Sequence, residues 1–124
     1  MKHQPRVTVV TVTYNALDAL SKTMRSVEAQ DYANIEYIIV DGASSDATPS
    51  MLAQYHGRLD RWVSEKDRGI YDAMNKGIAS ATGEVVGMLN SDDFYTDERV
   101  LARVADALAD PQIDACYGDV HYVS

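Results

Sequence analysis

Short apolar runs alternate with longer segments of helical periodicity along the whole chain. Residues 7–12 are β-branched throughout, which is typical of a strand, and apolar residues at a helical spacing follow them. The same alternation continues to the end of the chain. The predicted strands are 7–12, 37–40, 59–64, 84–89 and 113–123. This order predicts an α/β fold, in which a mostly parallel sheet of about five strands alternates with four helices and is covered on both faces.

The four predicted helices each carry a recognisable apolar face or boundary. Thr48 is expected to be the N-cap of the second helix, with Pro49 at its first position and an end near residues 56–57. The third helix opens at residues 67–69 and ends at 82–83. The residues that share a face are Leu17, Leu20, Met24 and Val27 in the first helix, Ile70, Met74, Ile78 and Ala81 in the third, and Val100, Leu101, Val104 and Leu108 in the fourth.

Length and composition indicate one globular domain, residues 1–124, with 46% apolar residues to fill its core. A formal net charge of -8 argues against a nucleic-acid partner and against an anionic membrane surface. The apolar runs are too short for a signal or transmembrane segment. Since the single Cys116 can form no internal disulfide, we expect a cytoplasmic protein.

Unusual polar groups follow three of the predicted strands, at 13–15, 41–46 and 90–93. The carboxyl ends of parallel strands meet at one edge of a sheet, where ligands bind. Adjacent carboxylates at Asp92 and Asp93 repel each other unless a cation or water screens them, which favours a site for a divalent cation. The simpler alternatives are that this pair caps the fourth helix and that Asp41 is a turn residue.

The start of the third helix adds groups that suit an anion. Free N–H groups at Gly69 and Ile70, with Arg68 nearby, are expected to face the same edge and to attract a diphosphate. Asn75 is a mediocre helix former, so a polar task is expected of its side chain. Lys76 is the weaker candidate, because a solvated surface cation explains it more simply.

Other nucleotide-binding folds do not fit the motifs. The turn after the first strand has no Gly-x-Gly-x-x-Gly, and no Walker phosphate loop is present. A phosphorylation receiver domain would need acids where Tyr14, Asn15 and Ser64 stand.

Four segments in order, 9–15, 39–48, 67–77 and 83–93, resemble the nucleotide-binding half of family 2 glycosyltransferases, which have the GT-A fold. The resemblance implies a donor that is a nucleotide-diphosphate sugar, with a UDP-sugar as the first candidate, and a saccharide or other hydroxyl acceptor. It also implies Mg2+ or Mn2+ at an Asp-x-Asp-like element. The implied donor contacts are Thr13, Tyr14, Asn15, Asp41, Arg68, Asn75 and Asp92, and the implied metal ligands are Asp93 and Asp92. Asn90 stands where the motif commonly begins with an acid.

An inverting transferase also needs a general base for the acceptor, and family members supply it from a later segment. The chain ends at Ser124, and the acceptor-binding half is expected to be missing. Asp119 is the only late carboxylate that could face the acceptor side. Two rival hypotheses therefore remain: a non-catalytic nucleotide-binding or assembly module, and a homo-oligomer that associates through an exposed sheet edge.

Overall fold

The computed structural model describes residues 4–108, which form four parallel strands and four helices in strict alternation. The predicted α/β class is confirmed, while the predicted fifth strand, Cys116 and Asp119 lie outside the described residues. The sheet order is β3-β2-β1-β4. The strands are β1 (Val7–Thr13), β2 (Ile35–Asp41), β3 (Arg61–Ser64) and β4 (Val85–Met88), and the helices are α1 (Leu17–Glu28), α2 (Thr48–Gln54), α3 (Ile70–Ser80) and α4 (Val100–Leu108).

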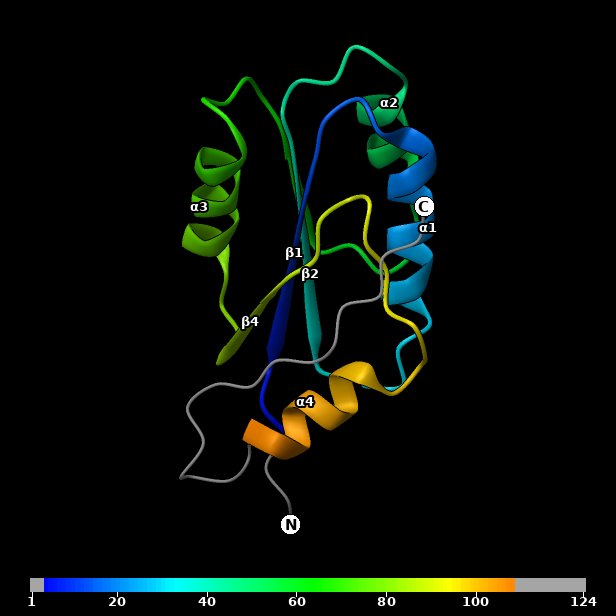
Figure 1. Ribbon diagram of the computed structural model, residues 1–124, viewed down its shortest axis with the longest axis vertical. Helices are drawn as coiled ribbons and strands as arrows, with labels where there is room; N and C mark the ends of the chain where they lie inside the picture. Colours follow the sequence, from blue (N-terminus) through cyan, green and yellow to red (C-terminus); the bar gives the residue numbers. More distant parts are fainter. Residues whose placement is uncertain (1–3, 109–124) are drawn as a thin grey trace.

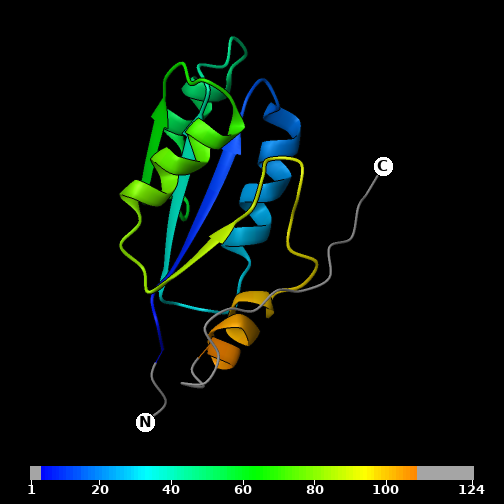
Figure 2. The ribbon, with the colours of Figure 1, turned by 60° about the vertical axis from the view of Figure 1, so that its left-hand side comes forward.

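Helices cover both faces of the sheet (Figure 1 and Figure 2). Helices α1 and α2 lie on one face and α3 on the other, while α4 lies near the end where the strands begin. The side chains of β1 alternate between the two layers, because Val9 packs in the α1 core and Val10 in the α3 core. No helix among residues 4–108 is long and apolar enough to cross a membrane.

Helix α3 approaches the sheet through small residues. A Cβ built on Gly77 would lie 2.2 Å from Cγ1 of Val10, so only a glycine permits this approach. Ala73 and Gly77 are the buried positions of the helix, whereas Ile70 and Ile78 are 50% and 47% exposed. The apolar spacing of Ile70 and Ile78 therefore does not mark the face that packs on the sheet.

The start of α2 differs by one residue from the prediction. The helix begins at Thr48, its N-cap is Ala47, and Pro49 lies in the first turn as expected. The N–H of Thr48 donates to Oδ1 of Asp46 at 2.9 Å, so this aspartate side chain satisfies one of the backbone donors at the N-terminus of the helix. Thr48 as the N-cap was wrong, because the helix already begins at Thr48 and the buried Thr48 hydroxyl has no hydrogen-bond partner among residues 4–108.

A buried glutamate joins three segments where β1 and β2 begin. Glu36 is 1% exposed and accepts hydrogen bonds from the hydroxyl of Thr8 and from the N–H and hydroxyl of Thr82, each at 2.8 Å. Arg6 lies 3.4 Å away. Burial raises the pKa of Glu36, but the bonds from Thr82 and Thr8 and the charge of Arg6 outweigh it, so the pKa is lowered overall.

Candidate functional site

The strand order reverses between β1 and β4, which makes this part of the sheet edge the expected place for a ligand. The chain passes from β1 to β2 and β3 on one side and then returns to β4 on the other side of β1. Pairing continues past the end of β4, because the N–H of Ser91 donates to the carbonyl of Val12 at 3.2 Å. The loops 13–15 and 90–93 therefore start side by side, as predicted.

Asp41 is a buried carboxylate at the end of β2. It is 0% exposed and accepts three hydrogen bonds: from the N–H of Ser44 at 2.9 Å, from the Ser44 hydroxyl at 2.5 Å, and from the Ser64 hydroxyl at 2.7 Å. A carboxylate offers about four acceptor positions, so one remains for another donor. The sequence interpretation missed Ser64 as a partner, although its place at the end of β3 is the signal that could have identified it.

Asn15 ties the loop after β1 to the loop after β2. Its N–H donates to Oγ of Ser44, and its Oδ1 accepts from the N–H of Ser45, both at 2.8 Å. Asn15 has a φ of 47° and Ala43 a φ of 62°, and these are the positive-φ residues other than glycine in the described chain. Backbone strain of this kind gathers at functional sites, where surrounding bonds hold it in place.

Thr13 is the last residue of β1 and Tyr14 follows it, and the two side chains differ in how far they are exposed. Oγ1 of Thr13 is buried and has no hydrogen-bond partner among residues 4–108. The side chain of Tyr14 is 62% exposed, beside Gly42. The open ring of Tyr14 can receive a stacked planar group, while the unpaired hydroxyl of Thr13 is buried.

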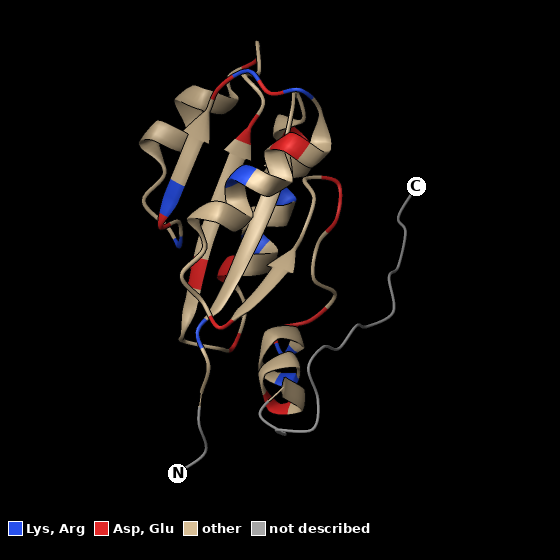
Figure 3. Cartoon of the chain, turned by 90° about the vertical axis from the view of Figure 1, so that its left-hand side faces the viewer, with Lys and Arg blue, Asp and Glu red and all other residues tan. Residues whose placement is uncertain are grey.

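Asn90, Asp92 and Asp93 form an acidic turn beyond β4, and Figure 3 shows acidic residues in red on the loop that follows this strand. The N–H of Asp93 closes the turn by donating to the carbonyl of Asn90 at 2.9 Å. Asp92 is exposed and Asp93 half-buried. Burial first, and then the charge of Asp92, raise the pKa of the Asp93 carboxyl. Both effects destabilise the ionised form of Asp93, and a nearby cation would offset this destabilisation.

The turn has the donor atoms that a hard cation prefers. Besides the two carboxylates, Oδ1 of Asn90 is buried and has no partner in the described part of the chain. Residues 4–108 contain no group of three or more His, Cys, Asp or Glu side chains that could hold a metal ion by themselves. Two carboxylates that share the ion with ligand phosphates are the usual arrangement for Mg2+. The residues therefore fit a cation that arrives with a phosphorylated ligand.

Aspartate side chains already accept hydrogen bonds from backbone N–H groups just before α3. The N–H of Gly69 donates to Oδ1 of Asp67 and the N–H of Arg68 to Oδ2 of Asp72, both at 3.0 Å. The expectation of a free N–H at Gly69 was therefore wrong. Gly69 has a φ of 120°, which other residues rarely adopt, so a glycine is required where the chain enters the helix.

Lys76 and Asn75 lie on the same helix but differ in their surroundings. Nζ of Lys76 lies 3.1 Å from Glu65 and 3.7 Å from Asp72, so this ammonium group is paired. The hydrogen bond with Glu65 and the neighbouring acids raise its pKa. Asn75 is exposed. Of the cations considered from the sequence, Arg68 remains the candidate for an incoming anion.

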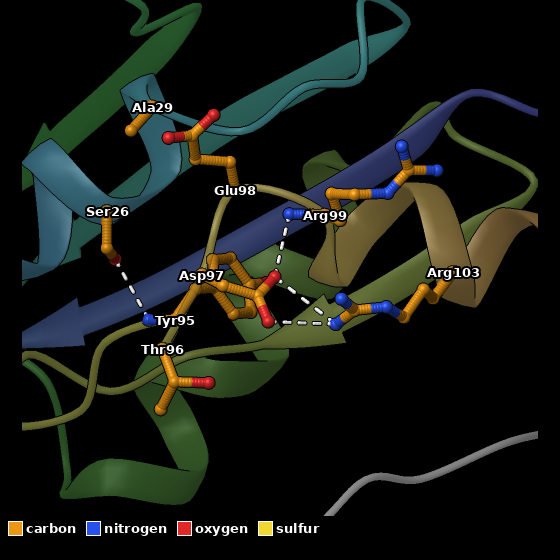
Figure 4. A pocket seen from close by; sticks show the side chains of 8 residues that line it. All are labelled: Ser26, Ala29, Tyr95, Thr96, Asp97, Glu98, Arg99 and Arg103. Carbon is orange, nitrogen blue, oxygen red and sulfur yellow. Dashed lines mark hydrogen bonds and ion pairs between the residues drawn. The ribbon is translucent and has the colours of Figure 1, made fainter.

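A hollow of about 570 Å³ lies elsewhere, beside α1 and the start of α4 (Figure 4). Asp97 occupies its wall and accepts a hydrogen bond from Arg103 at 2.9 Å. None of the residues predicted to bind a ligand lines it. The lining residues are Ser26, Ala29, Tyr95, Thr96, Asp97, Glu98, Arg99 and Arg103.

Comparison with known proteins identifies a family and individual proteins that the chain resembles. The model of the family described as "Glycosyl transferase family 2" matches residues 8–124. An uncharacterized glycosyltransferase of Mycobacterium tuberculosis is 41% identical over 110 residues, which are 88% of this chain and 42% of that protein. The succinoglycan biosynthesis protein ExoO of Rhizobium meliloti is 34% identical over 97 residues, covering 77% and 28% of the two chains. The chain thus spans less than half of these relatives.

Solved structures share the fold. A mannosyltransferase from Pyrobaculum calidifontis, solved in complex with GDP-Man and Mn2+, superposes with a TM-score of 0.81 at 35% identity, over 90% of this chain and 34% of that one. TarS of S. aureus in complex with UDP-GlcNAc has a TM-score of 0.76 at 24% identity, over 83% and 31%. These matches confirm the GT-A architecture that the four sequence segments implied.

Proposed function

The chain belongs to glycosyl transferase family 2, and from this premise we propose that it is the donor-binding part of a metal-dependent, inverting glycosyltransferase. The observation that carries the proposal is the acidic turn at residues 90–93, which starts beside the end of β1 where the strand order reverses. The proposed ligand is a nucleoside-diphosphate sugar, and the proposed acceptor is a hydroxyl group of a saccharide or another molecule.

The nucleoside end of the donor is assigned to the loops after β1 and β2. Tyr14 offers an exposed ring on which a base can stack. Asp41 has one acceptor position left for a base N–H or a ribose hydroxyl, and Thr13 has an unpaired hydroxyl in the adjacent register position. Asn15 contributes by holding the two loops together through its bonds to Ser44 and Ser45.

The diphosphate end is assigned to the acidic turn and the start of α3. Asp93 and Asp92 would hold Mg2+ or Mn2+, Asp92 would also reach the ribose, and Arg68 and Asn75 would approach the diphosphate. When bound, the cation supplies positive charge that stabilises the leaving diphosphate. The raised pKa of Asp93 supports this assignment, because the carboxylate is held where a positive charge is favourable.

Inversion requires a base that removes a proton from the acceptor hydroxyl on the face of the sugar opposite the leaving group. In the proposed arrangement the described loops bind and orient the donor and hold its phosphates. Asp119 stays a prediction for the base, since it lies outside the described residues. The similarity to the Pyrobaculum mannosyltransferase, whose structure contains GDP-Man and Mn2+, supports a nucleotide-sugar donor and leaves both UDP and GDP to be tested.

Isothermal titration of UDP and of GDP into the purified chain tests the proposal, with Mn2+ and with EDTA. We expect one nucleotide to bind in Mn2+ and to lose most of its affinity in EDTA or in the Asp93→Asn variant. The control is Asp31→Asn, which removes an exposed carboxylate elsewhere and should leave binding unchanged. Binding that does not depend on the metal, or that Asp93→Asn leaves intact, would contradict the assignment.

Donor hydrolysis, measured on the same samples, distinguishes a glycosyltransferase from a non-catalytic nucleotide-binding module. Release of free sugar from the matching nucleotide sugar, lost in Asp92→Ala, is expected for a transferase site. Tight nucleotide binding without hydrolysis or transfer would instead favour a non-catalytic binding module.

A further inference from the structure

Helix α1 presents a stripe of polar side chains toward the segment that carries the acidic turn. Thr23 and Ser26 are three residues apart on one side of α1, and Gln30 follows just after the helix, which ends at Glu28. Thr23 is 0% and Gln30 4% exposed, which is unusual for polar side chains. Their side chains bind backbone groups of residues 91–101.

Thr23 contacts the turn itself. Its hydroxyl lies 2.9 Å from the carbonyl oxygen of Ser91 and 2.5 Å from that of Asp93, and 3.1 Å from the carbonyl of Ala19 in its own helix. A hydroxyl carries one hydrogen, so it donates to one of these oxygens at a time. Three carbonyl dipoles thus converge on one proton, and this proton offsets their mutual repulsion.

The other two residues of the stripe hold the chain that follows. Oγ of Ser26 accepts a hydrogen bond from the N–H of Tyr95 at 3.1 Å, as Figure 4 shows. The amide of Gln30 donates to the carbonyl of Asp97 at 2.7 Å and accepts from the N–H of Leu101 at 3.0 Å. The segment after β4 is therefore held along its length by α1 and by Gln30, which follows the helix.

We propose that Thr23 is a positioning residue for the cation site, with Ser26 and Gln30 extending the same support. This inference rests on the proposed function, since it concerns the geometry of the acidic turn. Asp92 lies between two backbone points that Thr23 contacts, Ser91 and Asp93. Holding these points sets the direction of two carboxylates that would otherwise move apart, and groups that orient metal ligands typically change metal affinity when they are removed.

The test measures Mn2+ affinity by the electron paramagnetic resonance signal of the free ion, in the presence of the nucleotide that binds. Thr23→Val keeps the shape of the side chain and removes the hydroxyl, and we expect its Kd for Mn2+ to rise about tenfold or more. Thr23→Ser restores a hydroxyl and should bind Mn2+ nearly as well as the original chain. This rescue would not follow from packing alone, because serine lacks the methyl group.

The matched control is Thr11→Val. Thr11 is also 0% exposed on β1, and its hydroxyl bonds to the hydroxyl of Tyr37 at 2.9 Å rather than to a backbone group of the acidic turn. We expect this variant to lower the melting temperature while its Kd for Mn2+ stays the same. If Thr23→Val does not fold, Ser26→Ala provides a milder change, with a several-fold rise in Kd expected.

The outcomes separate the inference from its premise. If the original chain binds Mn2+ with nucleotide, Asp93→Asn abolishes the binding and Thr23→Val leaves the Kd unchanged, the positioning role is overturned and the proposed function stands. An unchanged Kd in Ser26→Ala, where only that variant folds, overturns it equally. If the original chain binds no Mn2+ with either nucleotide, the proposed function fails and the inference fails with it.

Discussion

Asp41 and Ser64 occupy the same register position at the ends of β2 and β3, and the Ser64 hydroxyl donates to Oδ2 of Asp41 across 2.7 Å. The bond joins two neighbouring strands at the edge where the donor is proposed to bind. Together with the two bonds from Ser44, it stabilises a fully buried carboxylate through hydrogen bonds from neutral groups. Hydrogen bonding of this kind is what allows a buried charge to persist.

Asp41→Asn should weaken both folding and nucleotide binding. With its amide oxygen in the place of Oδ2, asparagine can still accept from the Ser44 N–H and the Ser64 hydroxyl, but its amide nitrogen takes the place of Oδ1 and cannot accept from the Ser44 hydroxyl. We expect the free energy of unfolding to fall by about 2 kcal/mol and nucleotide affinity about tenfold, as for other lost bonds to charged groups. Urea denaturation and isothermal titration measure the two effects. In the control Ser64→Ala, which keeps the carboxylate, we expect a smaller loss of stability and no loss of affinity.

Tyr14→Ala should weaken nucleotide binding with little effect on stability, because the side chain is 62% exposed. Stacking of a base on an aromatic ring is worth about 1–3 kcal/mol, so affinity should fall about tenfold. Titration of the nucleotide measures it. Tyr14→Phe keeps the ring and should bind normally, and a loss in this variant would show that the hydroxyl, not stacking, is what matters.

Asp93→Asn should stabilise the metal-free protein while it removes metal binding. A carboxyl whose pKa is raised in the folded state opposes folding when it is charged, so the neutral amide should raise the melting temperature at pH 7. Thermal melts in EDTA test this. Asp92→Asn should raise it less, because Asp92 is exposed and has no burial to relieve. A lower melting temperature for Asp93→Asn would contradict the expectation.

Glu36 predicts a specific loss of stability in acid. Its folded pKa lies below the ordinary value of 4.5, so its contribution is complete above pH 4.5 and is lost as pH falls through the folded pKa. Glu36→Gln should cost about 1–3 kcal/mol at pH 7 and flatten the pH dependence below 4.5. Urea denaturation at a series of pH values measures both. The exposed Glu98→Gln should leave the profile unchanged.

Gly77→Ala should destabilise the protein although alanine is the better helix former. The added methyl group would meet Cγ1 of Val10, and overpacking of this kind costs about 1–3 kcal/mol. At the exposed Ala79, replacement by glycine measures helix propensity alone and should cost about 1 kcal/mol. Thermal or urea denaturation compares them, and a stabilised Gly77→Ala would show that α3 does not need this close approach.

The helix that packs most closely on the sheet shows why apolar spacing was an incomplete guide. Ile70 and Ile78 have the right period for a buried face, but Ala73 and Gly77 make the contact. Periodicity reports where large apolar residues are, whereas a close approach of backbones selects small ones. The same limit applies to α1, whose buried apolar residues were predicted and whose buried Thr23 was not.

The long-range hydrogen-bond partners of the polar residues also could not be predicted from the sequence. Asp41 and Asp93 were identified because they follow strands, but the bond from Ser64 to the Asp41 carboxylate and the bond from Thr23 to the Asp93 carbonyl join residues 23 and 70 positions apart in the chain. A carboxylate that is exposed and one that is fully buried look alike in a sequence. Burial and partners decide the pKa, and both are properties of the packed structure.

By itself the sequence determined the alternation of strands and helices, the family, and the edge at which the polar motifs gather. These follow from local side-chain preferences and from the rule that parallel strands end on one side of the sheet. Only the tertiary structure decided that Lys76 is paired with Glu65 and that Thr23 holds the acidic turn. The physical reason is that both contacts depend on the distance between groups in separate segments, which the order of residues alone does not set.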